Sequence, residues 1–233
     1  MHLTTEVYEG MPADSLLRAL TPDELENLLE YAHQRHVKKG KVLFEKGDPG
    51  DSMVLVLSGT LKASAWSVGD REVVFDYVGA GGIVGELAVL DGQPRAAQVA
   101  AVEDSEIIVI QRRFFLPFLE CHWLVATKVI EALCQKIRQS SVLLEDNAGV
   151  AMGPKLARGL LRLAEEGVNG DCNKVNLRFP INQGDLANYV SLSRENVNRQ
   201  LREWEDNGFV ELGRGHIAIL NSGALAEIGE PSA

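Results

Sequence analysis

The segment Gly85-Glu-Leu-Ala-Val-Leu-Asp-Gly-Gln-Pro-Arg-Ala-Ala97 brings a glycine, a glutamate and an arginine close together in the chain. Gly85 can open a short helical turn whose free amides point at an anion. These amides belong to Glu86, Leu87 and Ala88. Arg95 can fold back across the turn and hold a phosphate through two parallel hydrogen bonds. Glu86 would be costly beside a phosphate unless it accepts a sugar hydroxyl and shares Arg95. The segment therefore predicts a pocket for a ribose with a cyclic phosphodiester, or else a turn of the same shape that binds another ligand or none.

A second segment, residues 182–210, predicts two short helices with a tight connection between them. Ser193 can cap the second helix, in which Val197, Leu201 and Trp204 have the spacing of a buried stripe. The polar residues left on exposed or flanking positions are Arg194, Glu195, Asn198, Arg199 and Arg202. In the major groove of DNA, arginine pairs with guanine and glutamate accepts from the cytosine amino group. The pattern predicts a helix that reads base edges; the alternative is a solvated face with an ion pair between Glu195 and Arg199.

The elements around these two helices complete a recognisable order. Lys155–Glu166 is amphipathic, Val175–Pro180 has the composition of a strand, and residues 209–220 predict a hairpin with Arg214 at its turn. Helix, strand, helix, helix and hairpin in this order predict a winged helix-turn-helix, with Arg214 as a contact from the wing. Residues 148–154 predict a hinge before this domain.

Residues 122–147 predict one long helix with a single apolar seam. The seam consists of Trp123, Ala126, Ile130, Leu133, Ile137, Ser140, Leu144 and Asn147. Because spacings of three and four residues are those of a coiled coil, we expect pairing with a second copy of the chain. The alternative is that the helix packs on the domain before it. The polar Ser140 indicates either a device that fixes the register or a place where a ligand reaches the dimer axis. Cys134, beside the seam, is expected to be packed.

Between Gly40 and Arg113 the sequence alternates between short apolar runs and glycine-rich turns. The runs are Val42–Phe44, Met53–Leu57, Val73–Val78 and Ile107–Ile110. Many short strands with regular turn signals predict an antiparallel β-sandwich or barrel. Before this region, leucines at helical spacing and a start signal at Thr21-Pro22 predict helix over residues 12–37. The sequence as a whole thus predicts an α+β protein.

Composition and charge narrow the class of protein. The 233 residues are 45% hydrophobic and 24% charged, as in soluble globular proteins, and no apolar run is long enough to cross a bilayer. The net charge of −10 argues against a protein that coats nucleic acid without specificity, although residues 178–202 are locally basic. Three cysteines without CxxC spacing predict neither a disulfide framework nor a metal site. The N-terminus lacks the pattern of a signal peptide, so we expect a cytoplasmic protein without a membrane partner.

These motifs resemble the cyclic-AMP receptor protein (Crp/Fnr) family of bacterial transcription factors over nearly the whole chain. Ser193-Arg-Glu-Asn-Val-Asn-Arg199 is similar to the recognition helix of that family, and Gly85–Ala97 resembles the phosphate-binding cassette of cyclic-nucleotide-binding domains. The resemblance implies a cyclic-nucleotide-binding β-barrel (jelly roll) over residues 1–121 and a dimerisation helix with its hinge over 122–152. It further implies a winged helix-turn-helix DNA-binding domain over 153–233, and no catalytic step.

The resemblance also implies how DNA is contacted. The base-reading residues of the family fall on Arg194, Glu195 and Arg199, and its phosphate-contacting serine falls on Ser193. The start of the first motif helix falls on Asn182 and Gln183. A homodimer with these residues is expected to bind a double-stranded palindromic operator with TGTGA-like half-sites, about one helical turn apart.

Cyclic AMP is the effector that the resemblance favours. In related cassettes a threonine after the arginine goes with guanine and an alanine goes with adenine, and here the residue is Ala96. Ser140 and Ser141 fall where paired hydroxyl residues of the family touch the nucleobase, one from each subunit. Because a hydroxyl can donate and accept, cyclic GMP or both nucleotides stay as alternatives. An effector that is not a nucleotide, and a sensor without a DNA function, are further alternatives.

Two more expectations follow from the resemblance. His33 and Arg35 are candidates for contact with RNA polymerase, and His33 with His36 is expected at the surface near a helix end. The family has an aspartate that caps the first helix of the DNA-binding domain. Here Ala151 stands at that position, so Gly153 or Asn147 is expected to take over the cap.

Overall fold

The computed structural model describes residues 20–30, 32–67, 72–147, 151–164, 175–177, 181–213 and 216–230. The chain divides into two compact units, Met1–Ala65 with Phe75–Ser140 and Trp66–Val74 with Ser141–Ala233. In the described parts, no helix has the length and apolar character needed to cross a membrane. Across the same residues, no three His, Cys, Asp or Glu side chains group closely enough to hold a metal ion.

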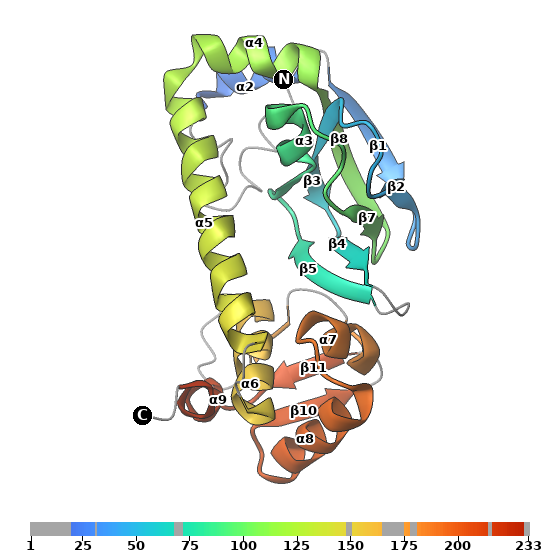
Figure 1. Ribbon diagram of the computed structural model, residues 1–233, viewed down its shortest axis with the longest axis vertical. Coiled ribbons are helices and arrows are strands. Elements are labelled where there is room, and N and C mark those ends of the chain that lie inside the picture. The colour runs from blue at the N-terminus through green and yellow to red at the C-terminus, as the bar shows by residue number, and fades with distance from the viewer. Residues whose placement is uncertain are drawn as a thin grey trace. The chain divides into compact units, whose positions relative to one another are not determined.

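The first unit is built on two four-stranded β-sheets (Figure 1). The strands are β1 (His33–Val37), β2 (Val42–Phe44), β3 (Ser52–Ser58), β4 (Leu61–Trp66), β5 (Glu72–Val78), β6 (Ile83–Val84), β7 (Gln98–Ala101) and β8 (Ser105–Gln111). One sheet has the strand order β1-β8-β3-β6 and the other has the order β2-β7-β4-β5. Short strands in two sheets are the jelly-roll form of a β-barrel, so the predicted fold of this region is confirmed.

Strand β3 is central to the packing because both of its faces are buried. Val54 and Val56 belong to a core cluster that includes Val99 from the other sheet. Met53 and Leu55, which alternate with them, belong to a second cluster that includes residues of the helices. A strand that is buried on both faces has a continuous apolar sequence rather than an alternating one. This explains the apolar run that marks β3 in the sequence.

The helices of this unit cover the outer side of β3 and β8. They are α2 (Pro22–Leu29), α3 (Glu86–Asp91), α4 (Arg112–Cys121) and the part of α5 (Trp123–Asn147) up to Ser140. Leu25 of α2, Phe115 of α4 and Val125 of α5 are fully buried in one cluster with residues of the two strands. The helices therefore share one core with the sheet that carries β3.

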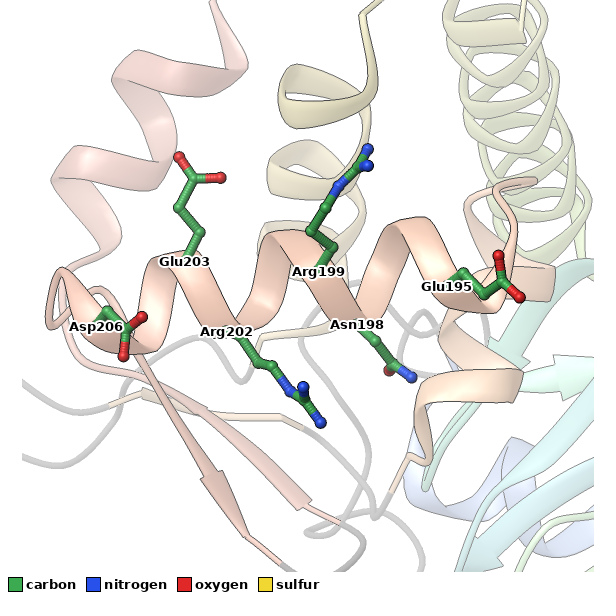
Figure 2. A pocket seen from close by; sticks show the side chains of 6 residues that line it. All are labelled: Glu195, Asn198, Arg199, Arg202, Glu203 and Asp206. Carbon is green, nitrogen blue, oxygen red and sulfur yellow. The ribbon is translucent and has the colours of Figure 1, made fainter.

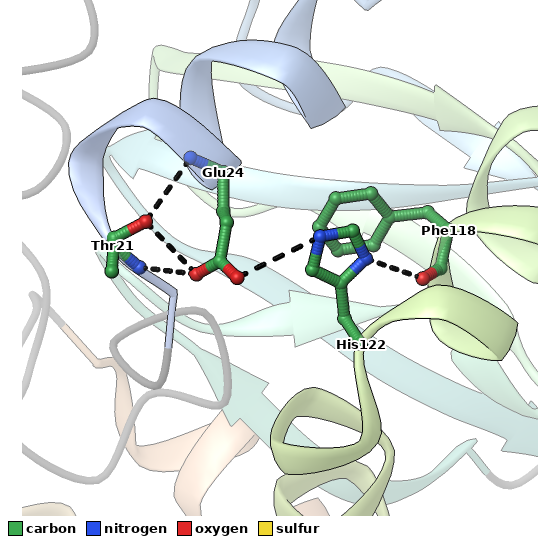
Figure 3. A network of polar contacts seen from close by, with 4 residues as sticks. All are labelled: Thr21, Glu24, Phe118 and His122. Atoms are coloured by element: carbon green, nitrogen blue, oxygen red, sulfur yellow. Dashed lines mark hydrogen bonds and ion pairs between the residues drawn. The ribbon is translucent and has the colours of Figure 1, made fainter.

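A polar network ties α2 to the corner between α4 and α5 (Figure 3). The Thr21 amide donates to the Glu24 carboxylate at 2.8 Å, and Thr21 Oγ1 accepts from the Glu24 amide at 3.3 Å. The Thr21 hydroxyl also donates to the Glu24 carboxylate at 2.9 Å. The two hydrogen bonds that this carboxylate accepts, from the Thr21 amide and the Thr21 hydroxyl, lower the pKa of Glu24, so its contribution to stability is present above the unfolded pKa and is lost as the pH falls through the folded pKa. The same carboxylate lies 3.7 Å from His122 Nε2, and His122 Nδ1 lies 2.7 Å from the Phe118 carbonyl oxygen.

The helix expected over residues 12–37 is wrong in its C-terminal part, where β1 occupies His33–Val37. Residues 12–19 lie outside the described residues, and α2 ends at Leu29. Because β1 is an edge strand whose first four residues are exposed, it lacks the apolar alternation that marks a strand. His33 and His36 are exposed, as expected, but on a strand rather than near a helix end. The sequence pattern does not predict α4.

Helix α5 has two different apolar faces. Val125 and Val129 are buried with the core of the first unit, and Leu133 packs against that core. Packing on its own domain, the alternative expectation for this helix, is therefore confirmed for one face. The seam residues Trp123, Ile130 and Ile137 are 74%, 54% and 66% exposed, so pairing through the seam stays a prediction. Cys134 is exposed, and the expectation that it is packed is wrong for the single chain.

The second unit has the predicted element order. Its elements are α6 (Met152–Leu163), β9 (Val175–Asn176), α7 (Gln183–Tyr189), α8 (Arg194–Asp206), β10 (Val210–Gly213), β11 (His216–Ile219) and α9 (Ser222–Gly229). The strands form a sheet of order β10-β11-β9, and α9 is an addition that the sequence pattern does not predict. Ala151 itself is the N-cap of α6, without a side-chain hydrogen bond. The expected cap by Gly153 or Asn147 is wrong, because Gly153 lies inside α6 and Asn147 ends α5.

A close contact between α6 and the end of α7 yields a test of this packing. A β-carbon at Gly159 would lie 2.2 Å from Val190 Cγ1, whereas at Gly153 in the same helix the nearest atom would be 3.8 Å away. Overpacking a filled site costs about 1–3 kcal/mol, so we expect Gly159→Ala to lower the free energy of unfolding by that amount. Gly153→Ala is the matched control, with unchanged or slightly raised stability. Denaturant unfolding followed by tryptophan fluorescence measures both variants, and equal stability would contradict the close contact.

Candidate functional site

The first group of predicted site residues lies at the start of α3. Gly85 precedes this helix with φ of 86°, a left-handed conformation that favours glycine, and no side chain caps the helix. A β-carbon at Gly85 would also lie 2.7 Å from Arg95 Nη1. Glu86 and Ala88 are buried, whereas Leu87 is 45% exposed. The predicted short turn is thus present, and its first position requires glycine.

Arg95 is buried beside this turn and is 5% exposed. Its guanidinium donates from Nη1 to the Gly85 carbonyl oxygen at 3.0 Å and from Nη2 to Ser52 Oγ at 3.2 Å. The same group lies 3.7 Å from the centre of the Phe44 ring. Its buried Nε has no hydrogen-bond partner among the described residues. Burial lowers the pKa of Arg95, against the attraction of Asp51 and other carboxylates. A buried cation with an unmatched donor is suited to an anion.

The loop after β2 fixes both Arg95 and α3. The Arg95 amide donates to the Asp48 carbonyl oxygen at 2.8 Å, and the Gly47 amide donates to the Arg95 carbonyl oxygen at 2.9 Å. Gly50 lies so close to α3 that a β-carbon there would be 2.0 Å from the β-carbon of Ala88. These loop residues are not among those predicted for the site. In the sequence, the two glycines of Gly47-Asp-Pro-Gly50 indicate a turn. They do not indicate that this turn contacts Arg95 and α3.

Glu86 is held by a residue of α5 that sequence reasoning misses. Its Oε1 lies 2.7 Å from Lys136 Nζ, and the Glu86 side chain is 10% exposed. The lysine balances the charge of a carboxylate that lies near the expected phosphate site. This ion pair reduces the electrostatic cost of having Glu86 beside a phosphate. Nothing in the spacing of the sequence connects these two residues, because they lie far apart in the chain and meet only through the packing of α5.

The remaining predicted ligand residues lie at the surface. Ser140 and Ser141 are exposed on α5, and Ala96 is exposed directly after Arg95. Ser140 follows Lys136 by four residues, so it lies one helical turn further along the face of α5 that contacts Glu86. The structure therefore brings Gly85, Glu86 and Arg95 together and places Ser140 on the adjoining helix face.

The second group of predicted residues begins two capped helices. Asn182 caps α7 with its side-chain oxygen, which accepts from two amides of the first turn at 2.8 and 2.9 Å. Gln183 is the first residue of α7 and is partly buried. Ser193 caps α8 and accepts from the Asn196 amide at 3.2 Å. The connection between the helices is tight, since Ser191 adopts a left-handed φ of 52°. The predicted cap at Ser193 is confirmed.

The exposed side of α8 carries Glu195 and Arg199, two of the three predicted base-reading residues (Figure 2). Arg194, the third, is the first residue of α8 and is also exposed. A hollow of about 550 Å³ along the helix is lined by Glu195, Asn198, Arg199, Arg202, Glu203 and Asp206. The predicted stripe Val197, Leu201 and Trp204 is buried. Within the described residues of α8, Glu195 and Arg199 form no ion pair, and Arg199 instead donates to Asn196 Oδ1 at 3.3 Å. The alternative of an internal pair is therefore not supported, and both charged groups face solvent.

The hairpin after α8 is attached to that helix by Glu205. Its Oε1 accepts from the Leu212 amide of β10 at 3.0 Å. This bond fixes β10, close to the turn of the β10–β11 hairpin, to the last turn of α8. Arg214, the predicted contact from the wing, lies outside the described residues.

Comparison with known proteins agrees with this architecture. Residues 34–122 match the family model of the cyclic nucleotide-binding domain, and residues 154–228 match that of the Crp-like helix-turn-helix domain. The chain is 29% identical over 218 residues to the Cyclic AMP receptor protein of Thermus thermophilus, covering 94% of this chain and 98% of that protein. It is 21% identical over 211 residues to the CRP-like cAMP-activated global transcriptional regulator of Mycobacterium tuberculosis, covering 91% of this chain and 94% of that regulator.

Solved structures show the same fold. The catabolite activator protein of Thermus thermophilus matches with a TM-score of 0.53 at 29% identity, covering 92% of this chain and 98% of that one. A mutant of CooA from Carboxydothermus hydrogenoformans matches with a TM-score of 0.77 at 17% identity, covering 96% and 99%. The c-di-GMP responsive regulator CLP of Xanthomonas campestris matches with a TM-score of 0.71 at 20% identity, covering 85% and 99%.

These matches extend over both halves of the chain, and the two curated relatives span almost the whole of it. They join a cyclic-nucleotide-binding domain to a DNA-binding domain and identify a regulator rather than an enzyme. The chain belongs to the cyclic-AMP receptor protein (Crp/Fnr) family of DNA-binding transcription regulators.

Proposed function

We propose that this regulator binds cyclic AMP at α3 and, as a homodimer paired through α5, binds a palindromic DNA operator through α8. The observation that carries the nucleotide site is the buried guanidinium of Arg95, whose Nε lacks a partner among the described residues. A phosphate oxygen placed against Arg95 and the first amides of α3 would satisfy this donor and balance the buried charge. Glu86, already paired with Lys136, would accept a ribose hydroxyl.

The preference for adenine rests on Ala96 and on the serines of α5. Related cassettes have alanine at this position where they favour adenine, and Ser140 lies one turn beyond Lys136. A serine hydroxyl can satisfy either purine, so cyclic GMP is the alternative effector. One neutral hydrogen bond is worth about 0.5–1.5 kcal/mol, which limits the preference to roughly tenfold. The Xanthomonas regulator with this fold is described as c-di-GMP responsive. An effector other than cyclic AMP or cyclic GMP is therefore a further alternative for this chain.

The homodimer is supported by the exposed face of α5. Trp123, Ile130 and Ile137 are large, apolar and more than half exposed, and they follow one another at intervals of seven residues. A heptad interval keeps one seam facing a partner helix along its length. A second copy of the chain offers the same seam, which suits an isologous two-fold contact.

The operator follows from this symmetry. A two-fold dimer presents two copies of α8, whose exposed Glu195 and Arg199 would read the major groove of successive half-sites. Because the two ligands would be coupled through one protein, DNA must tighten cyclic-nucleotide binding by the same factor as the nucleotide tightens DNA binding.

His33 and Arg35, exposed on β1, are the proposed contact with RNA polymerase. Calorimetry with cyclic AMP and cyclic GMP, with and without operator DNA, tests this scheme directly.

Arg95→Ala tests the phosphate site. We expect cyclic-AMP affinity to fall at least about 30-fold, since losing a charge-assisted contact to a buried anion costs roughly 2–5 kcal/mol. Isothermal calorimetry measures the affinity, and circular dichroism shows whether the variant is folded. Arg113→Ala is the matched control, because this nearby arginine is exposed. Affinity within threefold of the wild type in a folded Arg95→Ala protein would show that the pocket is assigned wrongly.

Ser140→Ala and Ser141→Ala test the link between the base and the dimer. We expect each to weaken cyclic-AMP binding by no more than about tenfold, and to weaken nucleotide-induced operator binding by a larger factor. Fluorescence anisotropy of labelled operator, titrated at saturating cyclic AMP, measures the second effect. Thr127→Ala is a control on the same helix, because the Thr127 hydroxyl donates to its own backbone at Trp123. Unchanged DNA activation in both serine variants would rule out this route, and tighter binding of cyclic GMP would overturn the base assignment.

Glu195→Ala tests base reading by α8. We expect it to relax the preference at one base pair of each half-site, with about 1–3 kcal/mol of discrimination lost. Glu203→Ala is the matched control, since Glu203 lines the same hollow two turns further along the helix. Selection of binding sites from random DNA compares both variants with the wild type. A selected motif unlike TGTGA, or unchanged specificity in Glu195→Ala, would contradict the assignment.

A further inference from the structure

The short helix α3 ends with carbonyl groups that need donors from outside it. A helix leaves its last four carbonyls without intrahelical partners, and α3 has no basic residue in its last turn. Gly92 ends the helix with φ of 72° and donates its amide to the Ala88 carbonyl oxygen at 3.0 Å. The Val89 carbonyl is satisfied in a different way, by a side chain from another helix.

That side chain is Arg112, the first residue of α4. Its Nε donates to the Val89 carbonyl oxygen at 2.7 Å. A guanidinium at the C-terminal end of a helix makes a charge-assisted hydrogen bond and complements the helix dipole. The backbone amide of Arg112 donates to the Asp51 carbonyl oxygen at 2.7 Å, directly before the serine whose hydroxyl accepts from Arg95. One residue thus contacts α3 and the strand end beside the buried arginine.

Helix α3 is consequently held at both ends by the helices that follow it in the chain. Glu86 at its start pairs with Lys136 of α5, and Val89 near its end accepts from Arg112 of α4. Between α4 and α5 stands the single residue His122, which is itself bonded to α4 and contacts α2. A shift of α3 would therefore act on both the start of α4 and the middle of α5.

We infer that Arg112 is a positioning residue that couples the occupancy of the nucleotide site to α4 and α5. The inference rests on the proposed function, since it concerns the response to nucleotide bound at Arg95. Arg112 does not need to touch the nucleotide. It fixes the C-terminal end of α3 to α4. When the first turn of α3 moves toward a phosphate, α4 therefore moves with it, and the change is not confined to α3.

The test compares Arg112→Ala, Arg112→Lys and the control Arg113→Ala in the full-length protein. Calorimetry gives the affinity for cyclic AMP with and without operator DNA, and the ratio of the two affinities is the coupling factor. We expect Arg112→Ala to keep its affinity for cyclic AMP within about tenfold, because the contacts at Arg95 remain. Its coupling factor should fall about fivefold or more. Arg112→Lys should recover part of the loss, since a lysine Nζ can donate to the same carbonyl, and Arg113→Ala should match the wild type.

Each outcome supports the inference, overturns it, or shows that the proposed function fails. A lowered coupling factor in Arg112→Ala with partial rescue in Arg112→Lys supports the inference. A lowered melting temperature with the coupling factor of both variants within twofold of the wild type shows a purely structural role and overturns it. If Arg112→Ala does not fold, Arg112→Lys becomes the deciding variant. A coupling factor of Arg112→Lys below that of Arg113→Ala then supports the inference, and an equal coupling factor overturns it. If the wild type itself gives no binding heat with either cyclic nucleotide, the proposed function fails first, and that failure is visible before any variant is compared.

Discussion

The buried guanidinium group of Arg95 constrains which residues can surround it in the first unit. Taking the charge of Arg95 out of water is costly unless hydrogen bonds and an opposite charge compensate it. The carbonyl of Gly85, the hydroxyl of Ser52 and the ring of Phe44 provide part of this compensation. Each requires a particular residue or backbone conformation at its own place in the chain. The residue types of the cassette are therefore determined by the contacts that the buried Arg95 guanidinium requires as much as by the contacts that a bound ligand requires.

Features that depend on local pattern could be predicted from the sequence. The apolar run of β3 and the cap at Ser193 are visible in consecutive residues, and the structure has them where they were expected. The sequence pattern predicts helix where the edge strand β1 lies, because the exposed residues of β1 carry no apolar alternation. Lys136 and Arg112 could not be found this way, since their partners at Glu86 and Val89 are set by tertiary packing and not by spacing in the sequence.

Helix α5 shows how one element can meet two demands. Val125 and Val129 contribute to the core of the first unit, while the seam residues Trp123, Ile130 and Ile137 are exposed. The sequence pattern indicates the seam but not a second apolar stripe at Val125 and Val129, because the two stripes overlap in the same stretch of chain. The structure shows that the second stripe packs on the first unit.

The exposed side of α8 changes sign along its length. Arg194 and Arg199 outweigh Glu195 in its first half, whereas Glu203, Glu205 and Asp206 outweigh Arg202 at its end. In the proposed regulator, the phosphates of DNA attract the first half and repel the second, and a net charge of −10 adds to the repulsion. Attraction to DNA of arbitrary sequence is then weak. Such a protein leaves wrong sites quickly, so that fewer of its molecules are held on the many competing sites of a chromosome and more are free to bind the true sites.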